Sequence, residues 1–482
     1  EIVRGDWSSD VCSSDLPDLT NYRWHALKLL ESDKEVCSKY PVNLPDVLDR
    51  SYESDIINQK YDFIGEVISE VLLHKQRQDV LTEKADAVLT SKIWGIPVFL
   101  CIMAVIFMLT FTVGDWLKGW LELGIDWLSG AVASGLEAVN ASGVITSLVV
   151  DGIIAGVGTV VTFLPNILIL FLCLALLEDS GYMARVAYVM EGVMSHLGLS
   201  GRAFIPMLLG FGCTAPAIMA SRALENKRDR YKVMLVTPFM SCNARLTIYI
   251  LFAEMFFGDN AMIVAYSMYL IGIVVAIVVS AIIHLIDRKK SVNYLMIELP
   301  EYKLPDSRTV AIYVWEKVKD YLGKAGTTIF VATLIIWLLL NFGVHGYVTD
   351  MSESFGAVIG RWLVPFFVPI GLGFWQIAVA LIAGISAKEV VVSSCAVLFG
   401  IVNASSPEGM SEFSAALSSI GFGSLNALCL MVFCLLYIPC TAALATVRRE
   451  SSTKYMLFTA AFQLAVAWIV TFAVYQIGQL VI

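Results

Sequence analysis

The chain has 482 residues, of which 57% are hydrophobic and only 16% are charged, and its formal net charge is −9 at pH 7. A soluble globular domain carries about 25% charged residues, so the composition excludes an ordinary soluble protein. It predicts an all-α fold of the polytopic membrane class. The basic residues form short clusters at the ends of apolar segments, which excludes a nucleic-acid-binding surface.

The N-terminal residues divide into two parts. Residues 1–16 begin without Met and lack the apolar core of a targeting signal. Residues 6–16 look like a translated sequencing adapter, so we predict that 1–16 is an adapter-derived artefact; a natural Ser/Asp-rich tail is the alternative. Residues 17–90 are polar, with amphipathic helical patterning over 22–30 and 61–73. We interpret 17–90 as the remnant of a cytoplasmic helical domain with its linker.

Residues 91–290 form the first predicted membrane half. Residues 93–113 approach the roughly 20 apolar residues that a spanning helix needs. Residues 114–143 alternate Trp and Leu with Gly and acids, which favours an amphipathic stretch at the membrane interface. The next apolar segment, 144–177, is expected to break at Pro165.

The remaining elements follow in order. Two apolar segments, 233–257 and 261–286, predict a hairpin around Gly258-Asp259-Asn260. Residues 291–325 are expected to be a cytoplasmic linker with an amphipathic helix at its end. The second membrane half is predicted to cover 326–482, with base-free external loops at 343–355 and 403–424 according to the positive-inside rule. Its predicted spanning or re-entrant segments are 327–342, the apolar residues around 380–394, 425–447 and 455–482.

The stretch 210–245 carries the strongest chemical signal. Its two halves, GFGCTAPAIMASR and TPFMSCNAR, each place a cysteine among helix breakers within long apolar sequence. Broken backbone at membrane depth is tolerated only where it is buried in protein or lines a water-filled cavity. Thiols presented there can ligate a soft or borderline metal ion. We therefore expect Cys213 and Cys242 to lie at the mouths of half-helices along a metal pathway.

A second copy of this pattern follows in the chain. Residues 208–222 and 380–394 are both apolar helices interrupted by a Gly and a small polar residue. The run Pro238 to Cys242 is echoed by Ile438-Pro439-Cys440. Interrupted apolar segments at corresponding positions of two halves indicate the binding site of a transporter. The sequence thus predicts two gate-type repeats containing broken or re-entrant helices.

Several motifs together resemble one family. They are GYMARVAYVMEGVM, GLSGRAFIPMLLGFGCTAPAIMASRALENKRDR, TPFMSCNARLTIY, ISAKEVVVSS and IPCTAALATVRRE, and in order and spacing they resemble ferrous iron transport protein B, the bacterial Fe(II) permease, over residues 17–482. Thr214-Ala215 and Thr247 depart from the usual family pattern, which puts fine geometry in doubt. The resemblance implies uptake of Fe²⁺ as the transported ion across the bacterial plasma (inner) membrane, by a multi-pass protein.

The resemblance also implies partners and an energy source. The family carries an N-terminal G domain that uses GTP and Mg²⁺, and we expect that domain to be absent from this chain, which has no G-x-x-x-x-G-K-[ST] loop. The chain itself is therefore expected not to be an enzyme. Its expected partners are the lipid bilayer, small cytoplasmic accessory proteins of the ferrous iron transport system, and further copies of itself.

The candidate site residues form two groups. A single Cys in an apolar segment is more often a packing residue, but the recurring breakers favour path-lining thiols here. Acids and bases inside apolar sequence mark an ion path or a buried pair. The metal-path candidates are Cys213, Cys242, Cys440, Met240 and Ser241, and the gating or ion-pair candidates are Lys388, Glu389, Glu178, Asp179, Arg245 and Glu254.

Each gating candidate has its own interpretation. Lys388 and Glu389 are expected to form a gating or structural ion pair within the break of the second repeat. Arg245 is expected to neutralise a carboxylate. Glu254 is interpreted either as a relay carboxylate or as a side chain reaching the helix end. The pair Glu178 and Asp179 could likewise be functional or mark an interfacial helix end.

Three other functions remain open at this point. A gate-type carrier of another divalent metal or of a nucleoside is one, although the clustered cysteines argue against a nucleoside. An intramembrane enzyme with a Cys nucleophile is another, but it needs a nearby base, and the five His are scattered along the chain. The third is an inert truncated fragment.

Overall fold

The computed structural model describes residues 22–30, 36, 53–71, 86–91, 94–139, 142–162, 164–224, 226–286, 302–344, 346–348, 351–401 and 407–481. The predicted artefact, residues 1–16, lies outside them. The chain divides into two compact units, Glu1–Glu83 and Lys84–Ile482. The first contains α2 (Tyr22–Leu30), which has the predicted bounds, and α4 (Glu53–Val71), which begins eight residues before the predicted start at 61.

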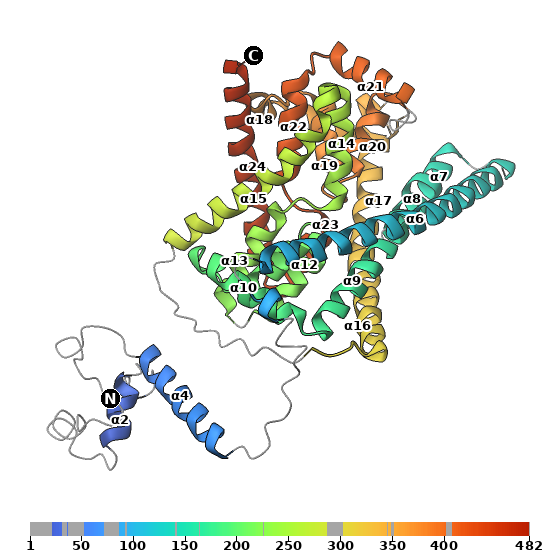
Figure 1. Ribbon diagram of the computed structural model, residues 1–482. Helices are drawn as coiled ribbons and strands as arrows, with labels where there is room; N and C mark the ends of the chain where they lie inside the picture. The colour runs from blue at the N-terminus through green and yellow to red at the C-terminus, as the bar shows by residue number, and fades with distance from the viewer. Residues whose placement is uncertain are drawn as a thin grey trace. The chain divides into compact units, whose positions relative to one another are not determined.

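The second unit opens with one long helix where the sequence predicted two elements. Helix α6 (Gly95–Ala138) is continuous for 44 residues, so the expected separate stretch at 114–143 is wrong. The glycines in this stretch each weaken a helix by only about 1 kcal/mol relative to Ala, and the backbone continues through them. At 1.5 Å per residue the helix is about 66 Å long, roughly twice the apolar thickness of a bilayer. Figure 1 shows its C-terminal part lying beside α7 and α8.

The chain then returns along α6 through several short pieces. These are α7 (Gly143–Ser147), the π-helix η2 (Leu148–Ile154), α8 (Ala155–Thr162) and α9 (Leu164–Asp179). Residue 163, between α8 and α9, lies outside the described residues, and Gly143–Asp179 has the length and hydropathy of one membrane span. The break at Pro165 therefore stays a prediction. Proline fits the first turn of a helix, where its missing N–H is not needed.

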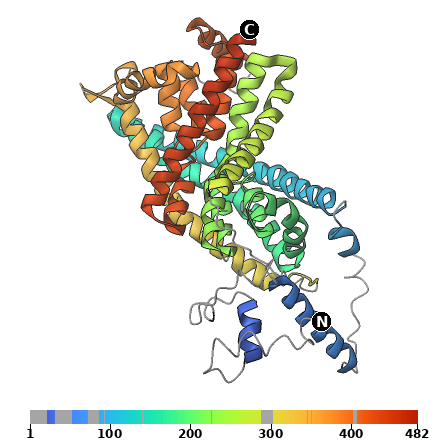
Figure 2. The same ribbon diagram turned by 90° about the vertical axis from the view of Figure 1, so that its left-hand side faces the viewer.

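The first gate repeat is a chain of short helices. They are α10 (Tyr182–His196), η3 (Gly201–Ala203), α11 (Phe204–Leu209), α12 (Thr214–Ala220), η4 (Ser221–Ala223), α13 (Lys227–Val236), η5 (Thr237–Phe239) and α14 (Asn243–Phe257). The turn η6 (Gly258–Asn260) then leads into α15 (Ala261–Ile286), which packs back on α14. This confirms the predicted hairpin, which Figure 2 shows as two yellow-green helices joined at one end.

The second gate repeat follows an amphipathic helix. Its elements are α16 (Ser307–Asp320), the π-helix η7 (Tyr321–Gly326), α17 (Thr327–Asn341), β1 (Phe342–Gly343), β2 (Gly346–Tyr347), η8 (Met351–Glu353), α18 (Phe355–Phe367), η9 (Val368–Ile370), α19 (Trp375–Ala383), α20 (Val390–Leu398), α21 (Pro407–Ser419), α22 (Ser424–Leu436), α23 (Thr441–Glu450) and α24 (Thr453–Val481). The two strands pair antiparallel, with Phe342 opposite Tyr347.

Helix α22 forms the centre of the core. Every residue from Cys429 to Leu436 is at most 1% exposed, because α14, α15 and α24 pack around it. Figure 1 shows α14, α22 and α24 side by side. A helix covered on all sides is apolar all round, which is why no amphipathic stripe marks this segment in the sequence.

The apolar helices are long enough to cross a bilayer. Within the described part of the chain, five helical segments have the length and hydropathy of a membrane span, or six if the pair Phe355–Ile370 and Trp375–Ala383, bent by 102°, counts as one. The sequence required the apolar material between its two predicted external loops to cross twice or re-enter, and this sharply bent pair lies there. The fold is thus the all-α polytopic architecture that the composition predicted.

A buried charge cluster joins three segments near the start of the second unit. The Arg185 side chain is 1% exposed and donates two hydrogen bonds to the Asp86 carboxylate, at 2.7 and 3.1 Å. The Tyr302 hydroxyl donates to the same carboxylate at 2.9 Å, and its ring lies 3.9 Å from the Arg185 guanidinium carbon. The hydrogen bonds from Arg185 and Tyr302 hold the pKa of Asp86 below its usual value, against the opposing effect of burial.

Replacing Asp86 by Asn is expected to lower the free energy of unfolding by about 2 kcal/mol, because the buried Arg185 loses its counter-charge while Asp86 is itself partly exposed. Since the folded pKa is lowered, the wild-type contribution is complete above the ordinary value of 3.8 and is lost as the pH falls through the folded value. Thermal unfolding of the purified chain in detergent should show this loss below about pH 4 in the wild type only. Equal pH profiles for both proteins would contradict the assignment.

Candidate functional site

Three cysteines occupy the same structural position in three helices. Cys213, Cys242 and Cys440 each stand in extended backbone directly before the first residue of α12, α14 and α23. The expected position at half-helix mouths is thus observed. All three are half-buried, whereas the four core thiols are buried: Cys173, Cys395, Cys429 and Cys434.

Backbone hydrogen bonds connect the two broken segments within each repeat. In the first, the Asn243 N–H donates to the Gly212 carbonyl at 3.4 Å. In the second, the Thr441 N–H donates to the Ile385 carbonyl at 2.9 Å. The residue after Cys242 therefore bonds to the residue before position 213. In the same way, the residue after Cys440 bonds to the residue before position 386. The counterpart of Cys213 is Ser386, so the repeats do not form a symmetric ring of thiols.

A small apolar plug surrounds two of the thiols. Val160, Ala215 and Ala442 form one buried cluster, and Cys213, Cys440 and Tyr321 pack against it. Tyr321 is the first residue of the π-helix η7; π-helical turns are rare and often occur at functional sites. We call Val160, Ala215, Ala442 and Tyr321 the plug.

Two cavities lie near the plug. One, of about 60 Å³, is lined by Ala215 and Ala442 of the plug itself and by residues of α9, η7 and α23. The other, of about 270 Å³, is lined from α8 by Gly158 and Thr162, which flank the plug residue Val160. Its other walls come from α6 and α20. The plug therefore borders the first cavity directly, and helix α8 connects it to the second.

Lys388 and Glu389 do not form the expected ion pair in this structure. The Lys388 ammonium donates to the Ile438 carbonyl at 2.5 Å and lies 3.3 Å from the ring centroid of Tyr437. Both carboxylate oxygens of Glu389 are buried without a hydrogen-bond partner. Consecutive residues at a helix start point about 100° apart, so Lys388 contacts the α22–α23 connection while Glu389 lines the larger cavity.

The break before α20 depends on a close approach at Gly384. A Cβ there would lie 2.1 Å from the Val391 side chain and 2.5 Å from the Tyr437 hydroxyl. Only glycine leaves room for both neighbours. The residue type in the GISAKE motif is thus explained by packing between the break and α22–α23.

Comparison with known proteins identifies the family. The Gate profile, described as "Nucleoside recognition", matches residues 160–256 and 322–454, and the profile "Ferrous iron transport protein B C terminus" matches residues 265–317. A protein named Fe(2+) transporter FeoB from Staphylococcus aureus (strain MSSA476) is 38% identical over 471 residues, covering 93% of this chain and 68% of that protein. The chain belongs to the Fe(2+) transporter FeoB family.

Relatives from other organisms agree. A Fe(2+) transporter FeoB of Methanocaldococcus jannaschii is 36% identical, covering 95% of this chain and 70% of that protein. A Porphyromonas gingivalis protein named Fe(2+) transport protein A/Fe(2+) transporter FeoB fusion protein is 35% identical, covering 96% and 62%. This chain thus spans 62% to 70% of the length of these FeoB relatives. No solved structure matches the chain.

The family membership establishes the transported ion and the class of protein. FeoB relatives are named for Fe²⁺ transport in bacteria and in Methanocaldococcus alike. Both matched profiles lie in the apolar part of the chain, and the relatives are named as transporters rather than enzymes. The chain is therefore a multi-pass FeoB membrane protein whose relatives favour Fe²⁺ over the nucleoside alternative.

Met240, Ser241 and Arg245 are buried around Cys242 in this FeoB chain. The guanidinium of Arg245 is 1% exposed and donates to the carbonyls of Pro238 and Met240, at 2.9 and 2.8 Å. These carbonyls replace the carboxylate that the sequence analysis expected. Ser241 is fully buried and donates to the Tyr249 hydroxyl at 3.3 Å. The Met240 side chain is 4% exposed and belongs to the main core cluster.

The other predicted carboxylates lie at helix ends. Glu178 lies near Tyr313 of α16, and burial together with the charge of Glu178 raises the pKa of Tyr313 to about 12. Asp179 accepts from the Asp306 N–H at 2.9 Å, at the start of the same helix. Glu254 is exposed, near the end of α14. The contacts of Glu178 and Asp179 match the helix-end alternative, and they position α16 against α9.

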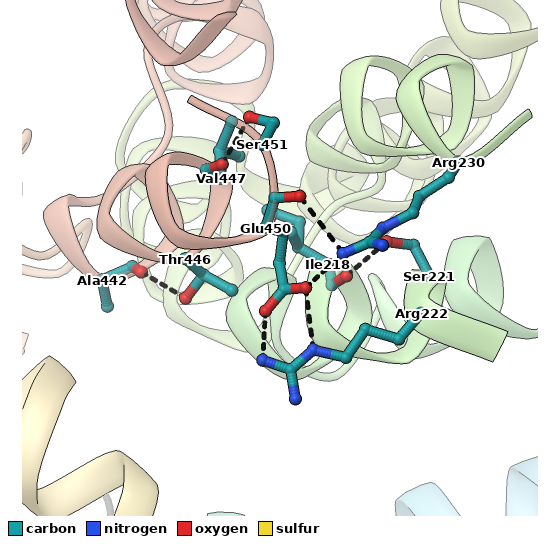
Figure 3. Close-up of polar contacts among 9 residues, drawn as sticks. All are labelled: Ile218, Ser221, Arg222, Arg230, Ala442, Thr446, Val447, Glu450 and Ser451. Carbon is teal, nitrogen blue, oxygen red and sulfur yellow. Dashed lines mark hydrogen bonds and ion pairs between the residues drawn. The ribbon is translucent and has the colours of Figure 1, made fainter. Parts of the chain in front are cut away.

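Two arginines of the first repeat bind Glu450 of the second. The Glu450 side chain is only 3% exposed, and its carboxylate accepts from the Arg222 Nε at 2.7 Å, from a second Arg222 nitrogen, and from Arg230 at 2.5 Å (Figure 3). Arg230 also donates to the Glu450 carbonyl at 3.2 Å. We call these three residues the Glu450 latch. It joins the C-terminal ends of α12 and α23, whose N-terminal ends present Cys213 and Cys440.

Sequence reasoning missed the latch, the plug and the Asp86 cluster. A single acid after Arg448-Arg449 was the available signal for Glu450, because a carboxylate is unfavourable at a helix C-terminus unless it is paired. Within the described ranges, no group of three or more His, Cys, Asp and Glu side chains is arranged to hold a metal ion.

Proposed function

We propose that this chain forms the pathway for Fe²⁺ through the bacterial plasma membrane, with Cys213, Cys242 and Cys440 as its soft ligands. The observation that carries the proposal is their shared position: three half-buried thiols stand at three helix N-termini, and two of them pack against a plug that borders a cavity. Fe²⁺ accepts thiolate as well as oxygen ligands.

The proposed orientation follows from the positive residues near the latch. Residues 227–232 at the start of α13 hold four bases, and the α23 end carries Arg448 and Arg449. Loops rich in Lys and Arg stay on the cytoplasmic side. The Glu450 latch then closes the cytoplasmic ends of α12 and α23, so the geometry described here corresponds to a state closed toward the cytoplasm.

Control of opening and the partners are also part of the proposal. The family resemblance supports a G domain that uses GTP and Mg²⁺ to drive opening. The Porphyromonas gingivalis relative carries Fe(2+) transport protein A in its name, which supports a small cytoplasmic accessory protein as a partner. Residues 17–90 are proposed as the helical connection to the G domain, and homo-oligomers remain part of this proposal.

Uptake of ⁵⁵Fe²⁺ by proteoliposomes containing this chain, kept reduced with ascorbate, tests the function. Uptake above protein-free liposomes is expected, and a supplied G domain with GTP and Mg²⁺ should change its rate. Parallel assays with Mn²⁺, Zn²⁺ and a labelled nucleoside separate the alternatives. A folded protein that gives no Fe²⁺ uptake with or without the G domain would overturn the proposal.

A further inference from the structure

The Glu389 carboxylate is the most unusual polar group in the described part of the second unit. Both of its oxygens are buried and neither has a hydrogen-bond partner. A buried carboxylate without a partner costs several kcal/mol. The ammonium of the neighbouring Lys388 is committed to a carbonyl and an aromatic ring. The unsatisfied oxygens therefore require a partner from the space that they face.

That space is a polar cavity. Besides Glu389, the cavity of about 270 Å³ is lined from α6 by Lys118, Glu122 and Asp126. Lys118 and Glu122 form an ion pair at 3.4 Å, which leaves Asp126 and Glu389 as the excess negative charge of the walls. A cavity of this size holds several water molecules. A low-dielectric pocket lined by one sign of charge concentrates ions of the opposite sign.

The cavity and the plug lie on opposite faces of α8. Gly158 and Thr162 of α8 line the cavity, and Val160 between them packs against Cys213 and Cys440. Helix α8 therefore connects the cavity that Glu389 lines with the plug against which Cys213 and Cys440 pack.

We propose that Glu389 docks a divalent cation in this cavity, with water completing the coordination shell. Glu122 and Asp126 act through their field rather than as ligands. The hard carboxylate oxygen binds Fe²⁺ and Mn²⁺ alike, so the site at Glu389 takes up divalent ions without distinguishing them. The thiols at the plug then select among these ions. The place of Glu389 ahead of the thiols rests on the proposed function; the docking of a cation at Glu389 does not.

Binding of Mn²⁺ to the purified chain in detergent, followed by electron paramagnetic resonance, tests the docking without transport. Glu389→Gln keeps the side-chain shape and removes a buried charge, so the variant is expected to fold and to bind Mn²⁺ at least tenfold more weakly. Asp126→Asn should weaken binding two- to threefold through the field. Glu412→Gln, which alters an exposed carboxylate of α21, is the matched control and should bind as the wild type does.

The outcomes separate this inference from the proposed function. Unchanged Mn²⁺ affinity in Glu389→Gln, or a wild type that binds no Mn²⁺, would overturn the docking site, whatever the Fe²⁺ uptake. Weakened Mn²⁺ binding in Glu389→Gln together with a wild type that transports no Fe²⁺ would support the docking site and overturn the proposed function. Where uptake is measurable, Glu389→Gln should raise the half-saturating Fe²⁺ concentration about tenfold and leave the maximal rate within twofold.

Discussion

Replacing Cys213 or Cys440 by serine is expected to reduce Fe²⁺ uptake by roughly 100-fold or more, because each change removes a soft ligand and keeps the side-chain size. Cys242→Ser should have a similar effect, since Cys242 occupies the same position before α14. The side chains are half-buried at helix N-termini, so a hydroxyl fits without repacking. Uptake of ⁵⁵Fe²⁺ per folded molecule in proteoliposomes measures the effect.

Two other thiols provide matched controls for these variants. Cys101 is exposed on α6 and Cys429 is buried within α22. Cys101→Ser should leave uptake unchanged. Cys429→Ser should lower stability by burying a hydroxyl while leaving the uptake per folded molecule within twofold. Normal uptake in the Cys213, Cys242 and Cys440 variants would remove the thiols from the pathway and leave the carboxylate at Glu389 as the candidate ligand.

The sequence predicted the places where helices break, because those breaks have a local cause. Pro238 and Pro439 each lie within a few residues of a helix boundary, since proline removes a backbone donor and restricts the preceding residue. The hairpin at residues 258–260 is local for a similar reason, as Gly258 adopts a positive φ of 49°. Such features are set by neighbouring residues and can be read from one sequence.

Other features depend on partners far away in the chain. Helix α6 continues past residue 114 although the Trp-rich stretch read as a separate element, because α7 and α8 pack along it. Lys388 and Glu389 read as a pair because they are adjacent, yet Lys388 is bound by the carbonyl of Ile438. Long-range packing determines the length of α6 and the partner of Lys388. The spacing of residues along one chain does not predict such packing.

The site shows the same division. The cysteine positions at helix starts follow from local breakers, so the sequence identified them. The plug and the cavities are formed by segments more than 200 residues apart, such as Val160 and Ala442. Two backbone hydrogen bonds establish that Cys213 and Ser386 are equivalent positions. Alignment of the two motifs alone could not exclude an alternative register, shifted by two residues.

The Glu450 latch is expected to couple the half-helices α12 and α23. Their C-terminal ends are held by one carboxylate shared between Arg222 and Arg230, and a second bond nearby joins the Tyr455 hydroxyl to the Tyr231 carbonyl at 2.6 Å. Because a carboxylate is unfavourable at the C-terminus of a helix, Glu450 loses its compensation when the ends separate. The latch therefore favours the arrangement in which the C-terminal ends of α12 and α23 are in contact, and stronger ion pairs favour it more.

Glu450→Gln is expected to shift the chain toward the open arrangement. The arginines are partly exposed, at 43% and 28%, so the lost pairing amounts to about 1.4 kcal/mol rather than the larger value for a fully buried pair. That change corresponds to about a tenfold rise in the open population. Fe²⁺ uptake by liposomes containing the chain without a G domain should rise by up to tenfold.

Two further variants decide whether the latch or general loosening causes this rise. Arg222→Gln should give a smaller increase, because Arg230 still binds Glu450. Glu316→Gln, on the exposed face of α16, should have no effect. If Glu450→Gln lowers the melting temperature but leaves uptake unchanged, the latch stabilises the fold without controlling the pathway. If uptake rises without a matching increase in Glu316→Gln, the ends of α12 and α23 form the cytoplasmic gate, and the G domain must act by weakening the contact that Glu450 makes.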